Sequence, residues 1–391
     1  MKTKSLWRVL SLCAVALAGC QHAPLRGTGD LGLVIERANG CVTLVDTTAR
    51  QAYGRVCGMG DLSHASAVFS RDGRYAYVFG RDGGLTKLDL LEARIERRVI
   101  QSGNAIGGAI SQNGRIVVAQ NYTPGGIKAF DADTLAPIAE VAAEYAPGQL
   151  SKVVGLADAP GQRFAYALFD AGEIWVSDFS NPAHPATQRF AAGRQPYDGL
   201  VTPDGRHYLA GLFGEDGVAL LDLWRLGDGS RKILPQYGEH EEKRPVFKMP
   251  HLRGWALAGG KAYLPAIGRH EVMVVDTATW RELARIPVRG QPVFVMARPD
   301  GRQVWVNFAL PDNGKIDVID TLRGEVEHRL EPGRAILHLE FTPRGEEVWL
   351  SARDDGKVLI YDTARFARVG EMAVDSPSGI FFTSRAHRIG F

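Results

Sequence analysis

Short apolar segments that end in an aspartate recur along the whole chain. Each is rich in the β-branched and aliphatic residues that favour strands, and each is bounded by polar or glycine-containing turns. The eight segments occupy residues 42–46, 85–89, 127–131, 174–178, 218–222, 272–276, 316–320 and 358–362. Their aspartates follow one another at intervals of 43, 42, 47, 44, 54, 44 and 42 residues. A repeat of this length predicts a modular fold built from one supersecondary unit.

A second repeated feature is a polar turn with a glycine, placed between two apolar strands ahead of each later copy. Clear examples are Phe69–Tyr75, Val201–His207 and Ala297–Gln303, and weaker copies contain Gly114, Gly161, Gly260 and Gly345. Four short strands per period of about 40–45 residues are typical of an all-β propeller. Both features count to eight once the chain ends are joined, which favours eight blades over seven.

The first blade lacks its own turn feature, and the C-terminal segment supplies one. Ile380–Thr383 is followed by residues 384–389, of which Ser384, Arg385, His387 and Arg388 are polar. We expect these last residues to pair with Leu31–Glu36 and complete blade one, because closure removes exposed sheet edges. The interval of 54 residues contains a polar insertion, Gln236–Lys248, which we expect to be a loop between blades five and six. Residues 31–391 are therefore expected to form one eight-bladed β-propeller.

The N-terminus has the pattern of a bacterial lipoprotein signal peptide. Basic residues precede the apolar run 9–18, which is too short to span a bilayer and ends in Leu17-Ala18-Gly19-Cys20. We expect residues 1–19 to be removed, Cys20 to carry lipid and residues 20–30 to form a tether. Gln21 indicates sorting to the outer membrane, so the expected location is the periplasm. An ordinary signal peptide with a chance cysteine is the alternative.

The remaining composition restricts the chemistry. An oxidising compartment would allow Cys41 and Cys57 to pair, but the sequence does not show whether their Cβ atoms meet, so a disulfide and two free thiols both stay open. No C-x-x-C-H motif occurs, which argues against covalent c-type haem. A net charge of +2 gives no broad basic field for nucleic acid. Neither a zinc-spaced cluster nor a nucleotide-binding loop is found, so no nucleotide cofactor is expected.

Residues that lead into the innermost strands should surround the central channel on the top face of the propeller. Two of these positions are His64 and His251, which lie four blades apart and would face each other across the channel. Basic residues gather in the same loops and in the neighbouring turns: Arg81, Lys152, Arg194, Arg253, Arg269, Arg289, Arg334 and Arg353. Guanidinium groups around a top-face funnel suit a flat ligand with several carboxylates. A histidine at such a position is also commonly a hydrogen-bonded structural residue, so both interpretations stay open.

Three segments resemble the haem d1 propeller of dissimilatory nitrite reductase. They are Ser63–Gly83, which contains His64, Met249–Gly254, which contains His251, and Gly333–Phe341. The resemblance covers essentially the whole mature chain. It implies that His64 is the ligand of a haem iron, that the second segment holds a distal histidine, and that the third holds a propionate-binding arginine.

The chain departs from the reductase in two respects, since the cytochrome c domain is missing and Ala67 stands where the reductase has an arginine. Propellers of this family without that domain take part in haem d1 biosynthesis in denitrifying bacteria. The resemblance therefore implies a maturation protein that binds haem d1 or its dihydro-haem d1 precursor. The residues expected to contact this ligand are His64, Arg81, Lys152, Arg194, Arg253 and Arg334.

Two functions follow from this resemblance. In the first, the protein assists a late oxidation (dehydrogenation) of the tetrapyrrole, with His251 as the acid–base residue because an imidazole titrates near neutrality. The sequence shows no flavin or nicotinamide motif that could take the electrons, so a partner or the bound iron would have to do so. In the second, the protein is a non-enzymatic carrier that delivers haem d1 to nitrite reductase together with other maturation proteins. A propeller that only binds peptides is a third alternative.

Overall fold

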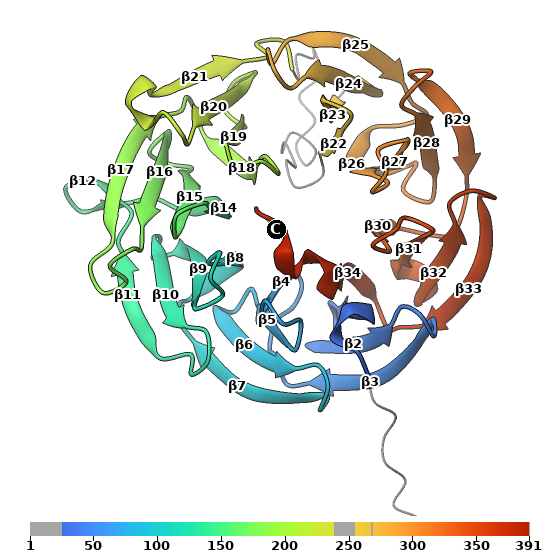
Figure 1. Cartoon of the computed structure of the whole chain (residues 1–391), viewed down its shortest axis with the longest axis horizontal. Helices are drawn as coiled ribbons and strands as arrows, with labels where there is room; N and C mark the ends of the chain where they lie inside the picture. Colours follow the sequence, from blue (N-terminus) through green and yellow to red (C-terminus); the bar gives the residue numbers. More distant parts are fainter. Residues whose placement is uncertain (1–25, 238–254, 267–268, 391) are drawn as a thin grey trace, which may run out of the picture.

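The computed structural model describes residues 26–237, 255–266 and 269–390, and these form a ring of eight four-stranded antiparallel sheets (Figure 1). The eight blades predicted from the repeats are therefore confirmed. In each blade the first strand lies nearest the central channel and the fourth lies on the outer rim.

The strands of blades one to four, from the channel outwards, are as follows. Blade one has β34 (Pro377–Phe382), β1 (Leu31–Glu36), β2 (Cys41–Asp46) and β3 (Gln51–Cys57). Blade two has β4 (Ser66–Phe69), β5 (Tyr75–Phe79), β6 (Gly84–Asp89) and β7 (Arg94–Ile100). Blade three has β8 (Asn104–Ile110), β9 (Ile116–Thr123), β10 (Ile127–Asp131) and β11 (Pro137–Val141). Blade four has β14 (Val153–Ala159), β15 (Arg163–Leu168), β16 (Glu173–Asp178) and β17 (Ala186–Ala191).

Blades five to eight follow the same order. Blade five has β18 (Pro196–Val201), β19 (His207–Leu212), β20 (Val218–Asp222) and β21 (Ser230–Ile233). Blade six has β22 (Ala256–Ala258), β23 (Lys261–Ala266), β24 (Glu271–Asp276) and β25 (Glu282–Pro287). Blade seven has β26 (Pro292–Ala297), β27 (Gln303–Phe308), β28 (Ile316–Asp320) and β29 (Glu325–Leu330). Blade eight has β30 (Ile336–Phe341), β31 (Glu347–Ala352), β32 (Lys357–Asp362) and β33 (Ala367–Ala373).

A few short elements complete the described chain. β12 (Glu144–Ala146) and β13 (Gln149–Leu150) form a small hairpin between blades three and four. Four 3₁₀ turns, labelled η, are η1 (Thr28–Asp30), η2 (Leu226–Asp228), η4 (Arg353–Asp355) and η5 (Thr383–His387). No helix in the described part of the chain has the length and apolarity needed to cross a bilayer.

The hydrophobic core lies between neighbouring blades. Every residue of β6, β27 and β31 is buried, because the middle strands are covered on both faces by adjacent sheets. An outer strand such as β7 is mostly exposed. Trp175, Trp305 and Trp349 are among the largest fully buried side chains. Burial on both faces explains why the middle strands are richer in apolar residues than the rim strands.

The aspartate that ends each third strand has a structural role. In all eight blades its side chain accepts a backbone N–H from the turn that follows, which is the usual turn chemistry of aspartate. The residues are Asp46, Asp89, Asp131, Asp178, Asp222, Asp276, Asp320 and Asp362. The feature that defined the repeat is thus explained by turn stability, away from the channel.

The chain termini close the ring through β34. This strand pairs with β1, and Gly32 lies opposite Phe382. A Cβ at Gly32 would come within 2.6 Å of the Phe382 ring, so the glycine makes room for this packing. The expected pairing with β1 holds only as far as Phe382, because the following residues form η5 and cross the middle of the ring (Figure 1).

Loops alternate between two faces of the ring. One face, here called the His64 face, contains the loops that lead into the innermost strands and the turns between second and third strands. The opposite face contains the other two sets of turns. The C-terminal segment lies on the opposite face, since Gly390 donates a hydrogen bond to Asp158 (2.9 Å) and Arg71 donates to the carbonyl of Ala386. η1 lies there too, where the Thr28 hydroxyl donates to the carbonyl of Asp72 (2.7 Å).

Candidate functional site

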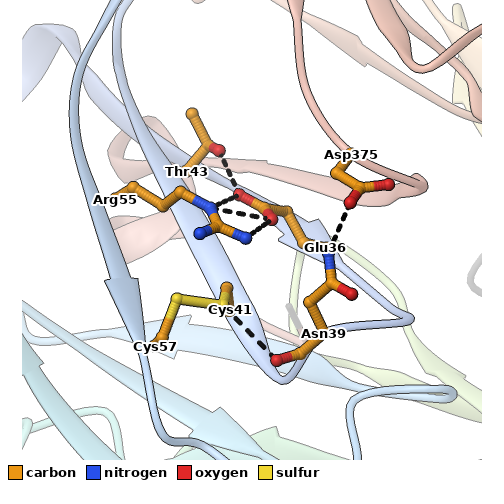
Figure 2. The surroundings of a disulfide bond; sticks show 7 residues. All are labelled: Glu36, Asn39, Cys41, Thr43, Arg55, Cys57 and Asp375. Carbon is orange, nitrogen blue, oxygen red and sulfur yellow. Dashed lines mark hydrogen bonds and ion pairs between the residues drawn. A yellow bond between two sulfur atoms is a disulfide. The ribbon is translucent and has the colours of Figure 1, made fainter.

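The loop that carries His64 begins at a disulfide. Cys41 and Cys57 are directly opposite in the β2–β3 register and are bonded (Figure 2). The open alternative of two free thiols is therefore resolved in favour of the disulfide. Met59, two residues after Cys57, donates its N–H to the carbonyl of Gly40 (3.0 Å) and has a buried side chain. These contacts fix the start of the loop to the end of blade one.

A buried carboxylate supports the same end of blade one. Glu36 is 1% exposed and accepts hydrogen bonds from Thr43 and from both Nε and Nη2 of Arg55 (Figure 2). Burial alone would raise the pKa of Glu36, but the hydrogen bonds from Arg55 and Thr43 outweigh it and lower the pKa. Asn39 in the adjoining turn donates to Asp375 (2.6 Å), which joins β1 to the loop before β34. The carboxylate therefore stays ionised and holds the blade edge.

His64 and Arg81 are in direct contact on the His64 face. The distance between Arg81 Nη1 and His64 Nδ1 is 2.8 Å. Partial burial lowers the pKa of His64, and the positive charges of Arg81 and Arg37 lower it further, while Asp61 opposes them. The N–H of Arg81 donates to the carbonyl of Asp61 (2.8 Å), so the turn of blade two and the His64 loop are held together. Two residues singled out from the sequence are thus neighbours.

Arg37 belongs to this site but was missed from the sequence. It is half-buried in the turn between β1 and β2, and the described residues offer its side chain neither a hydrogen bond nor an ion pair. Burial lowers the pKa of Arg37, and repulsion from Arg353 lowers it further, despite the opposing charge of Asp61. Half-buried guanidinium groups that repel one another form a natural binding place for an anion.

An aromatic wall continues the site across blades three to five. The hydroxyls of Tyr122 and Tyr197 are 3.0 Å apart, and Phe169 and Phe213 lie with their ring centroids about 6 Å from Tyr197. Burial raises the pKa of both tyrosines, and the charge of Arg81 partly offsets this effect. The charge of Arg81 therefore acts on both phenol groups.

Lys152, which directly precedes the innermost strand β14, contacts this wall. Its Nζ is 4.4 Å from the centroid of the Phe169 ring and 3.5 Å from Asp170 Oδ1. Arg194 is exposed and borders a pocket of about 490 Å³ that Phe169 also lines. A flat ring on this wall could stack on aromatic faces and meet cations at its rim.

Arg334 and Arg289 differ in how accessible their guanidinium groups are to a ligand. Arg334 is 75% exposed, but its Nε is 2.7 Å from Asp355 Oδ1, so a ligand would have to compete with that carboxylate. Arg289 was counted among the basic residues that gather in the channel loops, but its guanidinium is engaged within blade seven. Its Nε is 2.6 Å from the buried Asp317, and its Nη2 donates to the carbonyls of Ile316 and Leu330. Arg289 therefore ties strands of blade seven together.

Two candidate residues, His251 and Arg253, lie outside the described residues, so the predicted opposition of His64 and His251 stays a prediction. A different histidine, His338 in β30, lines the channel between Phe294 and Phe381. Its Nδ1 accepts the N–H of Ile380 (3.3 Å), and burial lowers its pKa to about 3. Its position inside a strand gave no loop signal by which the sequence could have revealed it.

One of the other cavities lies on the opposite face and is lined by an arginine that is already ion-paired. A cavity of about 810 Å³ lies between blades five and six on the opposite face, lined by residues such as Arg206, Asp222 and Trp280. Arg206 is already paired with Asp222 (2.9 Å). Within the described ranges, no cluster of three His, Cys, Asp or Glu side chains could hold a bare metal ion. The imidazole of His64, the guanidinium groups of Arg37 and Arg81, and the aromatic wall fit a flat ring that bears carboxylates.

Known proteins with the same sequence pattern support this description. The chain matches the family described as Cytochrome D1 heme domain over residues 26–386. It is 57% identical to Protein NirF of Pseudomonas aeruginosa over 383 residues, which cover 97% of this chain and 98% of the relative. It is 30% identical to the Dihydro-heme d1 dehydrogenase of the same organism, over 93% of this chain and 72% of that protein.

The fold has a close counterpart among solved structures. The Dihydro-heme d1 dehydrogenase NirN in complex with DHE superposes with a TM-score of 0.82 and 27% sequence identity, over 94% of this chain and 78% of that chain. The resemblance to the haem d1 propeller, first indicated by the segments around His64, is confirmed by these relatives. The protein belongs to the Cytochrome D1 heme domain family.

Proposed function

We propose that this protein acts in haem d1 biosynthesis and binds haem d1, or its dihydro-haem d1 precursor, on the His64 face. The observation that carries this proposal is the group of His64, Arg81 and Arg37 beside an aromatic wall. A tetrapyrrole with several carboxylates suits this surface, because its flat ring can stack on the aromatic wall and its acid groups can pair with the guanidinium groups. The relative with DHE bound has the same propeller.

Each part of the surface has a role in this proposal. His64 is the ligand of the haem iron, and Arg81, Lys152, Arg194 and Arg334 bind carboxylates around the ring. Arg253, which lies outside the described residues, belongs to the same proposed set. His251 remains the proposed acid–base residue, because an imidazole can both accept and donate a proton near neutral pH. When bound, the iron tetrapyrrole supplies the redox-active centre.

The chemistry carried out on the ligand divides the proposal into two. In one version the protein assists a late dehydrogenation, in which two electrons and two protons leave the tetrapyrrole and a redox partner takes the electrons. In the other version it carries haem d1 to nitrite reductase. The 30% identity to the Dihydro-heme d1 dehydrogenase favours the first version. The chain covers 72% of the length of that dehydrogenase, and dehydrogenation by this chain is therefore a proposal that needs its own test.

One experiment separates these versions. The purified protein is mixed with dihydro-haem d1 and an electron acceptor, and both the absorption spectrum and the mass of the extracted ligand are measured. A changed spectrum with a ligand two hydrogens lighter means dehydrogenation. A changed spectrum with unchanged mass means a carrier. An unchanged spectrum with no co-eluting ligand would refute tetrapyrrole binding altogether.

We also propose that Cys20 is acylated and anchors the protein to the periplasmic side of the outer membrane. Residues 26–30 lie on the face opposite His64, where Thr28 contacts Asp72 and Thr383. An anchor leaving from that face would keep the His64 face open to the periplasm and to nitrite reductase. In cells, Cys20→Ser should move the protein from the membrane to the soluble fraction and abolish labelling by radioactive palmitate. Retention in the membrane fraction would contradict the anchor.

A further inference from the structure

The contact between Arg81 and His64 fixes the position of the imidazole proton. A guanidinium has only donors, so Arg81 must donate and His64 Nδ1 must accept across their 2.8 Å separation. A neutral imidazole carries its one proton on the other nitrogen when Nδ1 is an acceptor. His64 is therefore held with its proton on Nε2.

This tautomer cannot bind iron. A metal–imidazole bond uses a nitrogen lone pair, and the second ring nitrogen of such a ligand normally donates its own N–H to an acceptor. In His64 the Nε2 lone pair is absent because that atom bears hydrogen, and the Nδ1 lone pair is used by Arg81. Ligation through Nε2 therefore requires Arg81 to leave. The imidazole proton then moves from Nε2 to Nδ1, with no net gain or loss of protons.

A carboxylate of the ligand could replace His64 as the hydrogen-bond partner of Arg81. Arg81 is half-buried, and within the described residues its side chain has no carboxylate partner at ion-pair distance. Its only hydrogen-bond acceptor there is the neutral imidazole. A hydrogen bond from guanidinium to carboxylate is roughly twice as strong as one between neutral groups, and it can be bidentate. A ligand acid group would therefore draw Arg81 away from His64.

We propose that Arg81 makes iron ligation by His64 conditional on a carboxylate of the tetrapyrrole. A ring whose acid group reaches Arg81 frees the imidazole and is ligated. A ring without that group leaves Arg81 on Nδ1 and the iron without its protein ligand. This inference rests on the proposed function, since it assumes that His64 is the iron ligand. It adds a specificity step in which acid-group recognition comes before iron binding.

Two iron porphyrins that differ only in their acid groups test this proposal. Ferric protoporphyrin IX and its dimethyl ester are titrated into the whole protein, and ligation is followed by absorption and electron paramagnetic resonance. The wild type should bind the diacid with a histidine-ligated spectrum that His64→Ala abolishes. It should bind the diester at least about 10-fold more weakly and without that spectrum.

The decisive variant is Arg81→Met, which removes the donor. It should gain histidine ligation of the diester, a result that loss of a purely structural or attractive residue would not give. Arg115→Met is the control, because Arg115 lies in the turn between β8 and β9 on the opposite face, away from His64. It should gain no diester ligation.

A measurement on the free wild-type protein tests the premise without any ligand. A long-range ¹H–¹⁵N correlation spectrum of neutral His64 should show the proton on Nε2, and a proton on Nδ1 would overturn the proposal. Wild-type ligation of the diester, or no gain in Arg81→Met, would overturn it as well. If the wild type binds neither porphyrin, the proposed function itself fails, so the two failures are distinguishable.

Discussion

Removing the disulfide next to the His64 loop should cost a predictable amount of stability. Cys41 and Cys57 are separated by 16 residues, and the Cα atoms lie 4.0 Å apart in paired strands. In the chain-entropy model, a cross-link that closes a loop of this size stabilises the folded state by about 3 kcal/mol at 25 °C. With an unfolding entropy of about 2.1 cal/mol/K per residue, the melting temperature should fall by about 4 °C in the double variant Cys41→Ala/Cys57→Ala.

Thermal unfolding followed by circular dichroism measures this change. The control is the wild type in excess dithiothreitol, which should fall by a similar amount, whereas the double variant should not respond to the reductant. Binding of ferric protoporphyrin IX at 25 °C should persist, because Met59 and Arg81 still hold the loop through backbone hydrogen bonds to Gly40 and Asp61. An unchanged melting temperature in both the variant and the reduced wild type would refute the argument that this cross-link restricts the unfolded chain.

Three further changes test the channel and the site. Burial lowers the pKa of His338 to about 3, so the folded protein resists its protonation, and the stability contributed by this group is full above pH 6.5 and is lost as the pH falls. In urea titrations the free energy of unfolding should fall by about 2 kcal/mol between pH 7 and 5, and His338→Asn should remove this loss. An equal loss in the variant would contradict the assignment to His338. Arg385 forms an ion pair with Glu340, whose side chain is 4% exposed, and Arg385→Met should lower the free energy of unfolding in urea by about 3 kcal/mol. Adding Glu340→Gln should restore part of this loss, and no restoration would argue against the ion pair. Arg37→Met should weaken the binding of ferric protoporphyrin IX about 5-fold at low salt and less at high salt. Arg115→Met, on the opposite face, should leave this affinity unchanged. Equal losses of affinity in the two variants would exclude a local anion site at Arg37.

The repeat made the architecture predictable. The eight aspartates and the eight polar turns have the same spacing as the blades, because each of them stabilises a turn at the same place in every blade. His64 was predicted to lead into an innermost strand, and β4 begins two residues later at Ser66. The contact between His64 and Arg81 could be expected only as a shared face, because its geometry depends on how two loops of blade two meet.

Other parts of the site could not be read from the sequence. Arg289 has the same loop position as a ligand-binding residue, but Asp317, 28 residues later, is buried beside it and takes its charge. Arg37 was missed because the first blade lacks the turn feature that located the others. The disulfide depended on the β2–β3 register, in which Cys41 falls directly opposite Cys57. Such long-range pairings are set by packing, which spacing alone does not reveal.

The most direct test of the account is the colour of the protein when it is isolated from cells that make haem d1. We predict that the wild type retains an iron tetrapyrrole in a ratio near one per chain. We also predict that His64→Ala loses the ligand or shows a shifted absorption spectrum. A wild-type protein that comes out colourless, or a His64→Ala variant with an unchanged spectrum and ligand content, would contradict the claim that this face binds a tetrapyrrole through His64.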